Sequence, residues 1–169
     1  MHILAGTGSR SLETAESDIK DAVKRFVIGR LSAEKTRTNG DLMVMSGMAE
    51  GFDALLARSA LALGIPLWCA IPNKGYGAYY WGRNSITGKD RLNQFHEIVS
   101  KAGKVVYVME DIHRKRGLYL DGQHSNFVRN DYMIAIADDF LIWNPKSSGT
   151  KQCYAKILQE KKPYTIIEV

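Results

Sequence analysis

The sequence predicts an α/β protein, a Rossmann-like three-layer α/β/α sandwich with a mainly parallel sheet. Two observations carry this prediction. Short runs that are almost continuously apolar are bounded by turn residues, and segments with helical spacing separate them. Strands of this kind are buried on both faces, so helices must cover the sheet above and below. Such sheets bind ligands beyond the carboxyl ends of their strands.

The elements follow in order along the chain. Residues 3–5 are predicted to form the first strand. A helical pattern follows from Ile19 to Leu31, and Ser11 could cap this helix. Further strands are predicted at 42–45, 65–71, 105–109, 140–143 and 164–167, and further helices at 52–63, 89–101, 127–137 and 150–160. Two connections, at about 73–88 and 110–126, are long enough to suggest functional loops. We expect residues 1–169 to form a single domain.

Composition sets the broad class. The chain has 169 residues, of which 45% are hydrophobic and 24% are charged, as in ordinary globular proteins. It has no apolar stretch of membrane-spanning length and no signal-peptide pattern, so we expect a cytoplasmic protein with no membrane contact. Cys69 and Cys153 have no metal-binding spacing, and we predict neither a metal nor a cofactor.

The net charge of +5 favours anionic partners, including nucleic acid, although a solvated lysine-rich surface explains it equally well. The densest basic stretch is at residues 113–116, with Arg114 and Arg116. His113 and His124 accompany Asp111 and Asp121 in the same loop, but their spacing supports neither a metal site nor acid–base chemistry.

Three glycine-containing turns end the first, second and fifth strands, at residues 6–10, 46–53 and 144–150. In a parallel sheet all three lie along one edge. Glycine lets a backbone approach a ligand, and the helix N-termini that follow present free N–H groups that suit phosphate. The convergence indicates a phosphate or sugar-phosphate site. The turns match neither GxGxxG nor the P-loop, which disfavours classical NAD binding and ATP hydrolysis.

Several ordered motifs resemble the SLOG superfamily of Rossmann-like domains, which includes DprA-like, YpsA-like and YspA-like proteins and LOG phosphoribohydrolases. The matching segments are "GTGSRS", "SGMAEGFDALLARSAL", "RNDYMIAIADDFLIW", "SSGT" and "KKPYTII". The resemblance spans most of the chain apart from the two long loops.

The resemblance implies a nucleotide-derived ligand over the turns. The residues it assigns to the ligand or its phosphate are Gly8, Ser9, Arg10, Ser46, Gly47, Met48, Ala49, Glu50, Arg129, Asn130, Ser148, Gly149 and Thr150. Gly6, Gly51 and Asp53 are expected to shape the turns, with Asp53 accepting backbone N–H groups. The resemblance also implies a homo-oligomer, because relatives are often dimers or larger.

Two departures from the family separate the functional hypotheses. Cys153 stands where LOG enzymes carry a catalytic glutamate, so we assign no catalytic residue. For the same reason, N-glycosidic hydrolysis of nucleoside 5′-monophosphates ranks third among the three functional hypotheses. Glu50 stands where DprA-like proteins often have arginine, and a carboxylate there would repel a nucleic-acid backbone. Glu50 could bind ribose hydroxyls or a base amino group, or simply face solvent. Binding of a nucleotide or nucleotide derivative, as sensor, carrier or noncanonical processing protein, is the leading hypothesis, and DprA-like binding of single-stranded nucleic acid is the first alternative.

The loop after the third strand holds an aromatic cluster. Tyr76, Tyr79, Tyr80 and Trp81 stand among glycines, where aromatic rings can stack on a base and close over it. The alternative is a loop that folds down on its own aromatic side chains.

Overall fold

The computed structural model describes residues 1–83, 87–110 and 122–169. Six parallel strands form one sheet in the order β4-β3-β2-β1-β5-β6. The strands are β1 (His2–Gly8), β2 (Leu42–Ser46), β3 (Leu67–Ile71), β4 (Lys104–Tyr107), β5 (Asp139–Trp143) and β6 (Tyr164–Ile167). The strand order reverses between β1 and β5, which places a topological switch point in the middle of the sheet. The predicted α/β class is confirmed.

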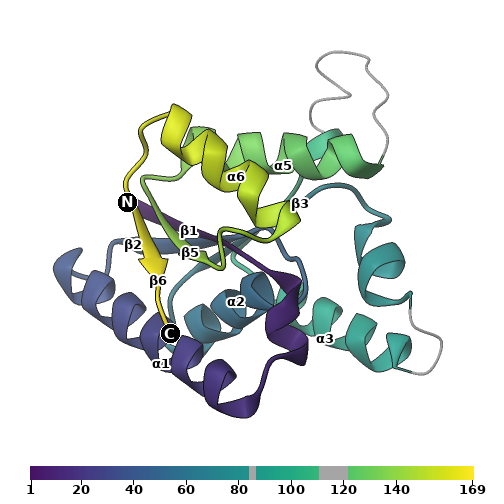
Figure 1. The fold of residues 1–169 in the computed structure, drawn as a ribbon, viewed down its shortest axis with the longest axis horizontal. Helices are drawn as coiled ribbons and strands as arrows, with labels where there is room; N and C mark the ends of the chain where they lie inside the picture. Colours follow the sequence, from purple (N-terminus) through teal and green to yellow (C-terminus); the bar gives the residue numbers. More distant parts are fainter. Residues whose placement is uncertain (84–86, 111–121) are drawn as a thin grey trace.

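Helices cover both faces of the sheet, as Figure 1 shows. On the lower face lie α1 (Ser17–Arg37), α2 (Phe52–Ala62) and α3 (Gly88–Lys101), and on the upper face lie α5 (Gly122–Ile136) and α6 (Ser148–Gln159). Two single turns complete the order, a 3-10 turn η1 (Arg10–Thr14) and a π-helical turn η2 (Gly77–Trp81). Within the described ranges, no helix is both long and apolar enough to cross a membrane.

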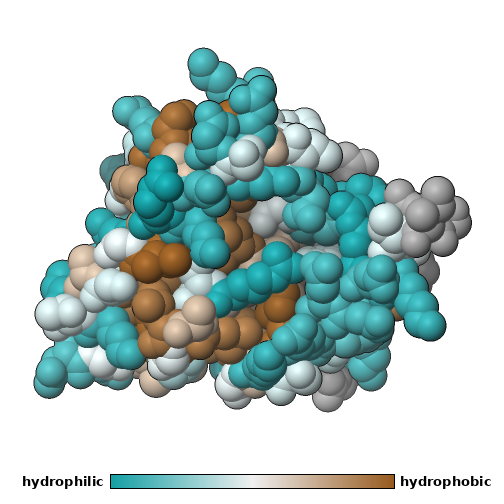
Figure 2. All heavy atoms as spheres, turned by 90° about the horizontal axis from the view of Figure 1, so that it is seen from below, coloured by the Kyte–Doolittle hydropathy of each residue, from teal (hydrophilic) through white to brown (hydrophobic). Residues whose placement is uncertain are grey.

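Alternation along the strands divides the core into two layers. Leu4 packs below the sheet with residues of α1 and α2, whereas its neighbour Ala5 packs above the sheet with residues of α5 and α6. Figure 2 shows the molecule from below, with hydrophobic residues in the middle of this face and hydrophilic residues around them. The sheet is therefore sandwiched, and its two ends are the places where loops can build a site.

The structure corrects several predicted boundaries. Ser11 does not cap α1, which begins at Ser17; instead Ser9 caps η1, its side chain accepting from the Ser11 N–H at 3.1 Å. β4 ends at Tyr107, two residues early. α5 begins at Gly122, so the end of the predicted 110–126 loop is helical. The basic stretch 113–116 and the acidic residues Asp111 and Asp121 lie outside the described residues, as does the side chain of His124.

Candidate functional site

A cavity of about 380 Å³ lies at the carboxyl ends of β1 and β5, where the strand order reverses. We call it the edge cavity. The loop after β1, the start of α5 and the start of α6 form its walls. Its lining residues are Thr7, Gly8, Ser9, Arg10, Ala49, Asp53, Asn126, Phe127, Arg129, Asn130, Ser147, Ser148, Gly149 and Thr150. Nine of the thirteen residues that the sequence assigned to a ligand are thereby brought together.

The N-terminus of α6 opens into the edge cavity. Ser147 is the N-cap with extended backbone, but its side chain makes no capping bond and instead donates to the Thr150 hydroxyl at 2.8 Å. The first N–H groups of a helix have no acceptor within the helix and carry partial positive charge. A Cβ at Gly149 would meet nothing within 4 Å, so space remains in front of these groups. This wall is suited to an anion.

Arg129 and Asn130 approach the cavity from α5, and both are more than nine-tenths buried. The Arg129 guanidinium donates to the Gly47 carbonyl and, through Nε, to Asn130 Oδ1 at 2.8 Å. Asn130 in turn donates to Gln152 Oε1 on α6 at 3.2 Å. A buried cation is thus held in a fixed position between the turn after β2 and α6.

Asp53 lies behind these groups as a buried carboxylate. It accepts the Ala49 N–H at 3.4 Å, in the turn-shaping role that the sequence predicted. Burial raises the pKa of Asp53 to about 6, against the opposing attraction of Arg129, the Ala49 N–H and Arg10. Among the described residues that line the cavity, Arg10 and Arg129 are the cations and Asp53 the anion, so the net charge of the lining is positive.

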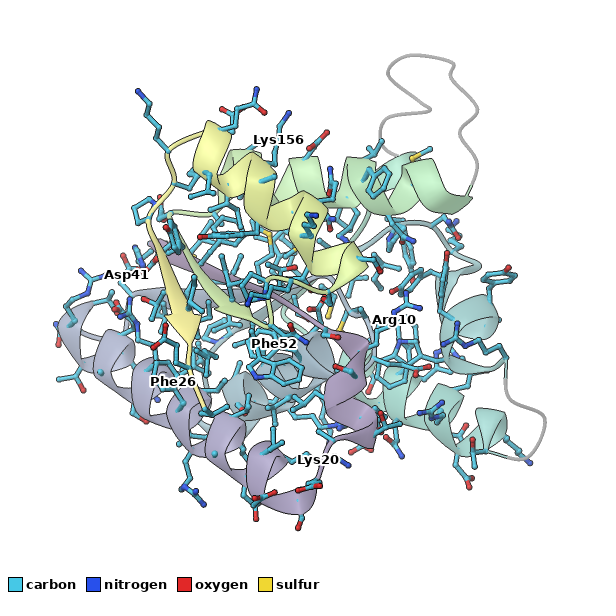
Figure 3. All side chains as sticks on the ribbon, in the orientation of Figure 1. Arg10, Lys20, Phe26, Asp41, Phe52 and Lys156 are labelled. Carbon is cyan, nitrogen blue, oxygen red and sulfur yellow. The ribbon has the colours of Figure 1, made fainter. Side chains whose placement is uncertain are left out.

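The first turn lies against the start of α2. A Cβ at Gly8 would come within 2.5 Å of Phe52, and one at Gly6 would collide with Leu56. Figure 3 shows Phe52 in the middle of the molecule. The Ser9 carbonyl accepts the Phe52 N–H at 3.4 Å, so the first turn also caps α2. Both glycines are required for packing, and Gly8 lines the cavity as well.

Arg10 extends from η1 toward η2, as Figure 3 shows. Its guanidinium lies 4.8 Å from the centre of the Tyr80 ring, and the Tyr80 hydroxyl accepts from Asn126 Nδ2 at 3.2 Å. The side-chain amide oxygen of Asn126, Oδ1, is buried and has no hydrogen-bond partner. Tyr80 therefore joins two walls of the cavity, and Asn126 retains unused hydrogen-bonding capacity there.

The turn after β2 is closed, which corrects part of the predicted site. The Ser46 hydroxyl is fully buried and donates to the Asp53 carbonyl at 2.9 Å while accepting the Met48 N–H. Met48 is also fully buried, with a φ of 59°. A Cβ at Gly47 would lie 2.5 Å from Arg129 and 2.9 Å from Asp53. The polar groups of this turn bind one another, and of its predicted ligand residues only Ala49 lines the cavity.

Glu50 was expected either to bind a ribose or base of the ligand or to face solvent, and the structure shows neither. Its side chain is 7% exposed, so it does not face solvent, and it does not line the edge cavity. It pairs with Arg91 of α3 at 3.4 Å through one oxygen, while the other oxygen is buried without a partner. Gly51, with a φ of 80°, forms the turn as predicted, because a Cβ there would lie 2.8 Å from the Ser9 carbonyl.

The aromatic loop divides into buried and exposed members. Tyr76 and Trp81 are 1% and 2% exposed in the core beside Phe95, so the prediction that they stack on a ligand is corrected. The Trp81 indole N–H donates to the Met48 carbonyl at 2.9 Å, which anchors η2 to the closed turn. Tyr79 is 71% exposed. Tyr80 lies against Arg10 and binds Asn126, and both of these residues line the cavity.

Cys153 lies one turn into α6 and is buried, and burial raises the pKa of its thiol to about 11. It is a small core side chain rather than an acid or base. Sequence reasoning missed four lining residues, Thr7, Asn126, Phe127 and Ser147. Asn126 and Arg129 are spaced i, i+3 on α5, so a correct start for this helix would have predicted that both share a face.

The comparisons with known proteins bear on the fold. No family model matches the chain, and no curated protein matches its sequence. Among solved structures, DNA processing protein A (DprA) from Streptococcus pneumoniae is similar with a TM-score of 0.62 and 15% identity, covering 100% of this chain and 51% of that chain. The structural-genomics target TM1055 is similar with a TM-score of 0.55 and 16% identity, covering 97% of this chain and 72% of that chain. This chain thus spans about half the length of the DprA chain. The Rossmann-like fold expected from the resemblance to DprA-like proteins is confirmed.

Proposed function

We propose that this chain, which shares the Rossmann-like fold of DprA and TM1055, binds a nucleotide or a nucleotide derivative in the edge cavity. One observation carries the proposal. The open N-terminus of α6 and two arginines, Arg10 and Arg129, face the same 380 Å³ cavity at the switch point of the sheet. Helix N-termini and guanidinium groups both bind phosphate, and the switch point is the usual ligand site of this architecture.

The phosphate belongs at the α6 end of the cavity. There Ser148, Gly149 and Thr150 line the cavity at the first turn of α6, whose first N–H groups have no acceptor within the helix. Arg129 adds a buried positive charge whose position is already fixed by Gly47 and Asn130. Because these groups are preorganised, binding costs little reordering of the protein.

The nucleoside belongs at the Arg10 end. The guanidinium of Arg10 and the amide of Asn126 are held together by Tyr80. A flat guanidinium stacks on a base, and an amide with a spare oxygen can accept a hydrogen bond from a base or a sugar hydroxyl. The two ends together fit a ligand that carries both a phosphate and a polar ring system.

The test is isothermal titration with AMP, GMP, CMP, UMP, cyclic AMP and ADP-ribose, comparing the wild type with Gly149→Asp. Space is available for the new side chain, and an acid in the first turn favours the helix, so this variant should fold. It places a negative charge where the phosphate would bind, and at about 4 kcal/mol for unit charges 4 Å apart near a surface the affinity should fall more than tenfold.

Gly29→Asp is the matched control. It makes the same substitution at an exposed position in α1 where a Cβ also meets nothing. We expect Gly29→Asp to bind as the wild type does. The absence of binding by every nucleotide tested, or equal binding by Gly149→Asp, would contradict the proposal.

A second candidate is binding of single-stranded nucleic acid. Two observations favour it, the structural similarity to a DNA processing protein and the net charge of +5. An oligonucleotide that bound through its backbone would lose affinity steeply with salt, with a slope set by the number of phosphates contacted. Fluorescence anisotropy of labelled single-stranded DNA between 50 and about 200 mM salt, with and without mononucleotide competitor, separates this candidate from the first.

A further inference from the structure

The edge cavity holds a buried carboxylate among groups that suit an anion. Asp53 lines the same cavity as Arg10, Arg129 and the start of α6, and it is only 5% exposed. A phosphate bound at the start of α6 would add a second negative charge to this space of about 380 Å³. Like charges in a partly buried site repel each other strongly. Binding is therefore weakened unless the carboxylate loses its charge.

Arg129 lies beside Asp53 but is hydrogen-bonded to other groups. A Cβ added to Gly47 would lie 2.8 Å from Arg129 Cζ and 2.9 Å from Asp53 Oδ2, so the two side chains flank one gap. The guanidinium donates to the Gly47 carbonyl and to Asn130. Its attraction for Asp53 acts through space, and an incoming phosphate would compete for the same positive charge.

The groups around Asp53 act on it in opposite directions. Burial is the largest influence and raises the pKa of this carboxyl to about 6. Arg129 from α5, the Ala49 N–H, Arg10 from η1 and the Gly8 N–H oppose burial and stabilise the charged form. The charge of Asp53 therefore depends on cations that also face the proposed phosphate.

The other titratable groups of this cluster stay neutral. Burial raises the pKa of the Tyr76 hydroxyl, and it raises the pKa of the Cys153 thiol on α6 to about 11. The negative charge of Asp53 makes a smaller contribution in the same direction to both groups. Its field thus reaches α6, the helix at whose N-terminus the phosphate would bind. In this cluster of described residues, Asp53 is the group that titrates near neutral pH.

On the basis of the proposed function, we propose that the edge cavity takes up a proton on Asp53 when it binds the phosphate of its ligand. The proton comes from solvent, and no bond of the ligand breaks. Protonation removes the carboxylate charge and leaves both arginines, Arg10 and Arg129, to the phosphate. A neutral carboxyl still has an oxygen that accepts the Ala49 N–H, so the turn keeps its shape.

This coupling fixes the sign of the pH dependence. Below pH 6 the carboxyl of the free protein is already protonated, and affinity is at its highest. Above pH 6 binding must draw a proton from solvent, so affinity falls as pH rises. A unit charge about 10 Å away in a protein site changes the free energy of a carboxylate enough to alter affinity about tenfold. We therefore expect a fall of about tenfold in total between about pH 5 and pH 8.

Titration calorimetry counts the proton directly. Cyclic AMP and ADP-ribose are titrated at pH 6.5 in buffers that differ in their enthalpy of ionisation, because the phosphates of these two probes do not titrate near that pH. The slope of the observed enthalpy against the buffer enthalpy gives the number of protons taken up. A tenfold coupling that begins at a pKa of about 6 gives an uptake of about half a proton at pH 6.5.

Asp53→Asn is the matched variant, because it keeps a side-chain oxygen for the Ala49 N–H and cannot titrate. Its proton uptake should fall to near zero, and its affinity should no longer depend on pH. Asp21→Asn makes the same substitution at an exposed position in α1 and should take up as much as the wild type. For AMP, whose own phosphate titrates near pH 6, the readout is the difference in uptake between the wild type and Asp53→Asn.

The outcomes separate this coupling from the proposed function. A nucleotide that binds with equal proton uptake in the wild type and Asp53→Asn overturns the coupling and leaves nucleotide binding intact. If no nucleotide binds, the proposed function fails and the coupling fails with it. If Asp53→Asn does not fold, carboxyl NMR of wild-type protein labelled with ¹³C-aspartate decides. The pKa of Asp53 should rise when cyclic AMP or ADP-ribose binds, and an unchanged pKa overturns the coupling.

Discussion

The turns after β2 and β5 are both built from serine, glycine and small side chains, yet the first is closed and the second is open to the edge cavity. In the turn after β2, a Cβ on Gly47 would collide with Arg129 and Asp53, and the Ser46 hydroxyl is used internally. In the turn after β5, a Cβ on Gly149 would meet nothing, and the first N–H groups of α6 face a cavity. Composition alone does not distinguish a closed turn from an open one. What distinguishes them is whether buried partners already occupy the polar groups.

The largest expected difference between the two turns is the change in the free energy of unfolding when one methyl group is added to each of them. Gly47→Ala should lower the free energy of unfolding by about 3 kcal/mol, because the clash is with buried groups that cannot shift freely. Gly149→Ala should leave the free energy of unfolding unchanged or raise it by about 0.5 kcal/mol, since the backbone there suits alanine. Urea unfolding of both variants measures the difference. Equal effects at the two sites would show that the closed and open turns do not differ as described.

The pH dependence of stability probes the closed turn through Asp53. The pKa of this carboxyl is raised from 3.8 to about 6 by burial, so its contribution to stability is fully present below pH 4 and is lost as pH rises through 6. Asp53→Asn removes this titration. The stability of the variant relative to the wild type should therefore improve by about 2–3 kcal/mol between pH 4 and pH 7. Thermal unfolding across this range tests it, and a constant difference would contradict it.

Removing the hydrogen bond that anchors η2 to the closed turn should have a smaller effect on the free energy of unfolding. Trp81→Phe leaves the Met48 carbonyl without its donor in a buried position, and the free energy of unfolding should fall by about 1–2 kcal/mol. Tyr79→Phe, in the same turn but exposed, is the control and should change little. If both variants unfold at the same urea concentration, the indole hydrogen bond does not stabilise the turn.

The smallest expected effect is on nucleotide affinity, when Tyr80 beside the edge cavity is replaced. Tyr80→Leu removes the ring beneath the Arg10 guanidinium, which is worth about 0.5–1 kcal/mol, so nucleotide affinity should fall two- to fivefold. Tyr80→Phe keeps the ring and loses only the hydroxyl that binds Asn126, and it should bind more nearly as the wild type does. Titration calorimetry distinguishes the two. Equal losses of affinity in Tyr80→Phe and Tyr80→Leu would assign the effect to the hydroxyl instead, because both variants lack it.

The sequence predicted the fold class and the edge where the turns meet, because alternation of buried strands and helices is a local signal. It also predicted the shaping role of Asp53, which depends on its place at the start of a helix. It did not predict that the Ser46 hydroxyl and the Gly47 carbonyl are occupied, because their partners include Arg129, 82 residues away in the chain. The sequence left open whether the aromatic loop stacks on a ligand or folds down on its own side chains, and it did not decide that Tyr76 and Trp81 are the buried members. Their packing against Phe95 depends on how a loop folds back on α3.

The sheet order has a consequence for how the molecule forms. β1 lies beside β5, so Leu4 pairs with Asp139, and the Ile3 N–H bonds to Asp138 across a separation of 135 residues. The strands from β1 to β4 add outward one after another and can assemble as the chain emerges from the ribosome. The two walls of the edge cavity meet only after β5 inserts beside β1, one of the longest loop closures in the chain. Appearance of the edge cavity therefore reports completion of the fold, and a chain interrupted before β5 carries the first glycine turn without its opposite wall.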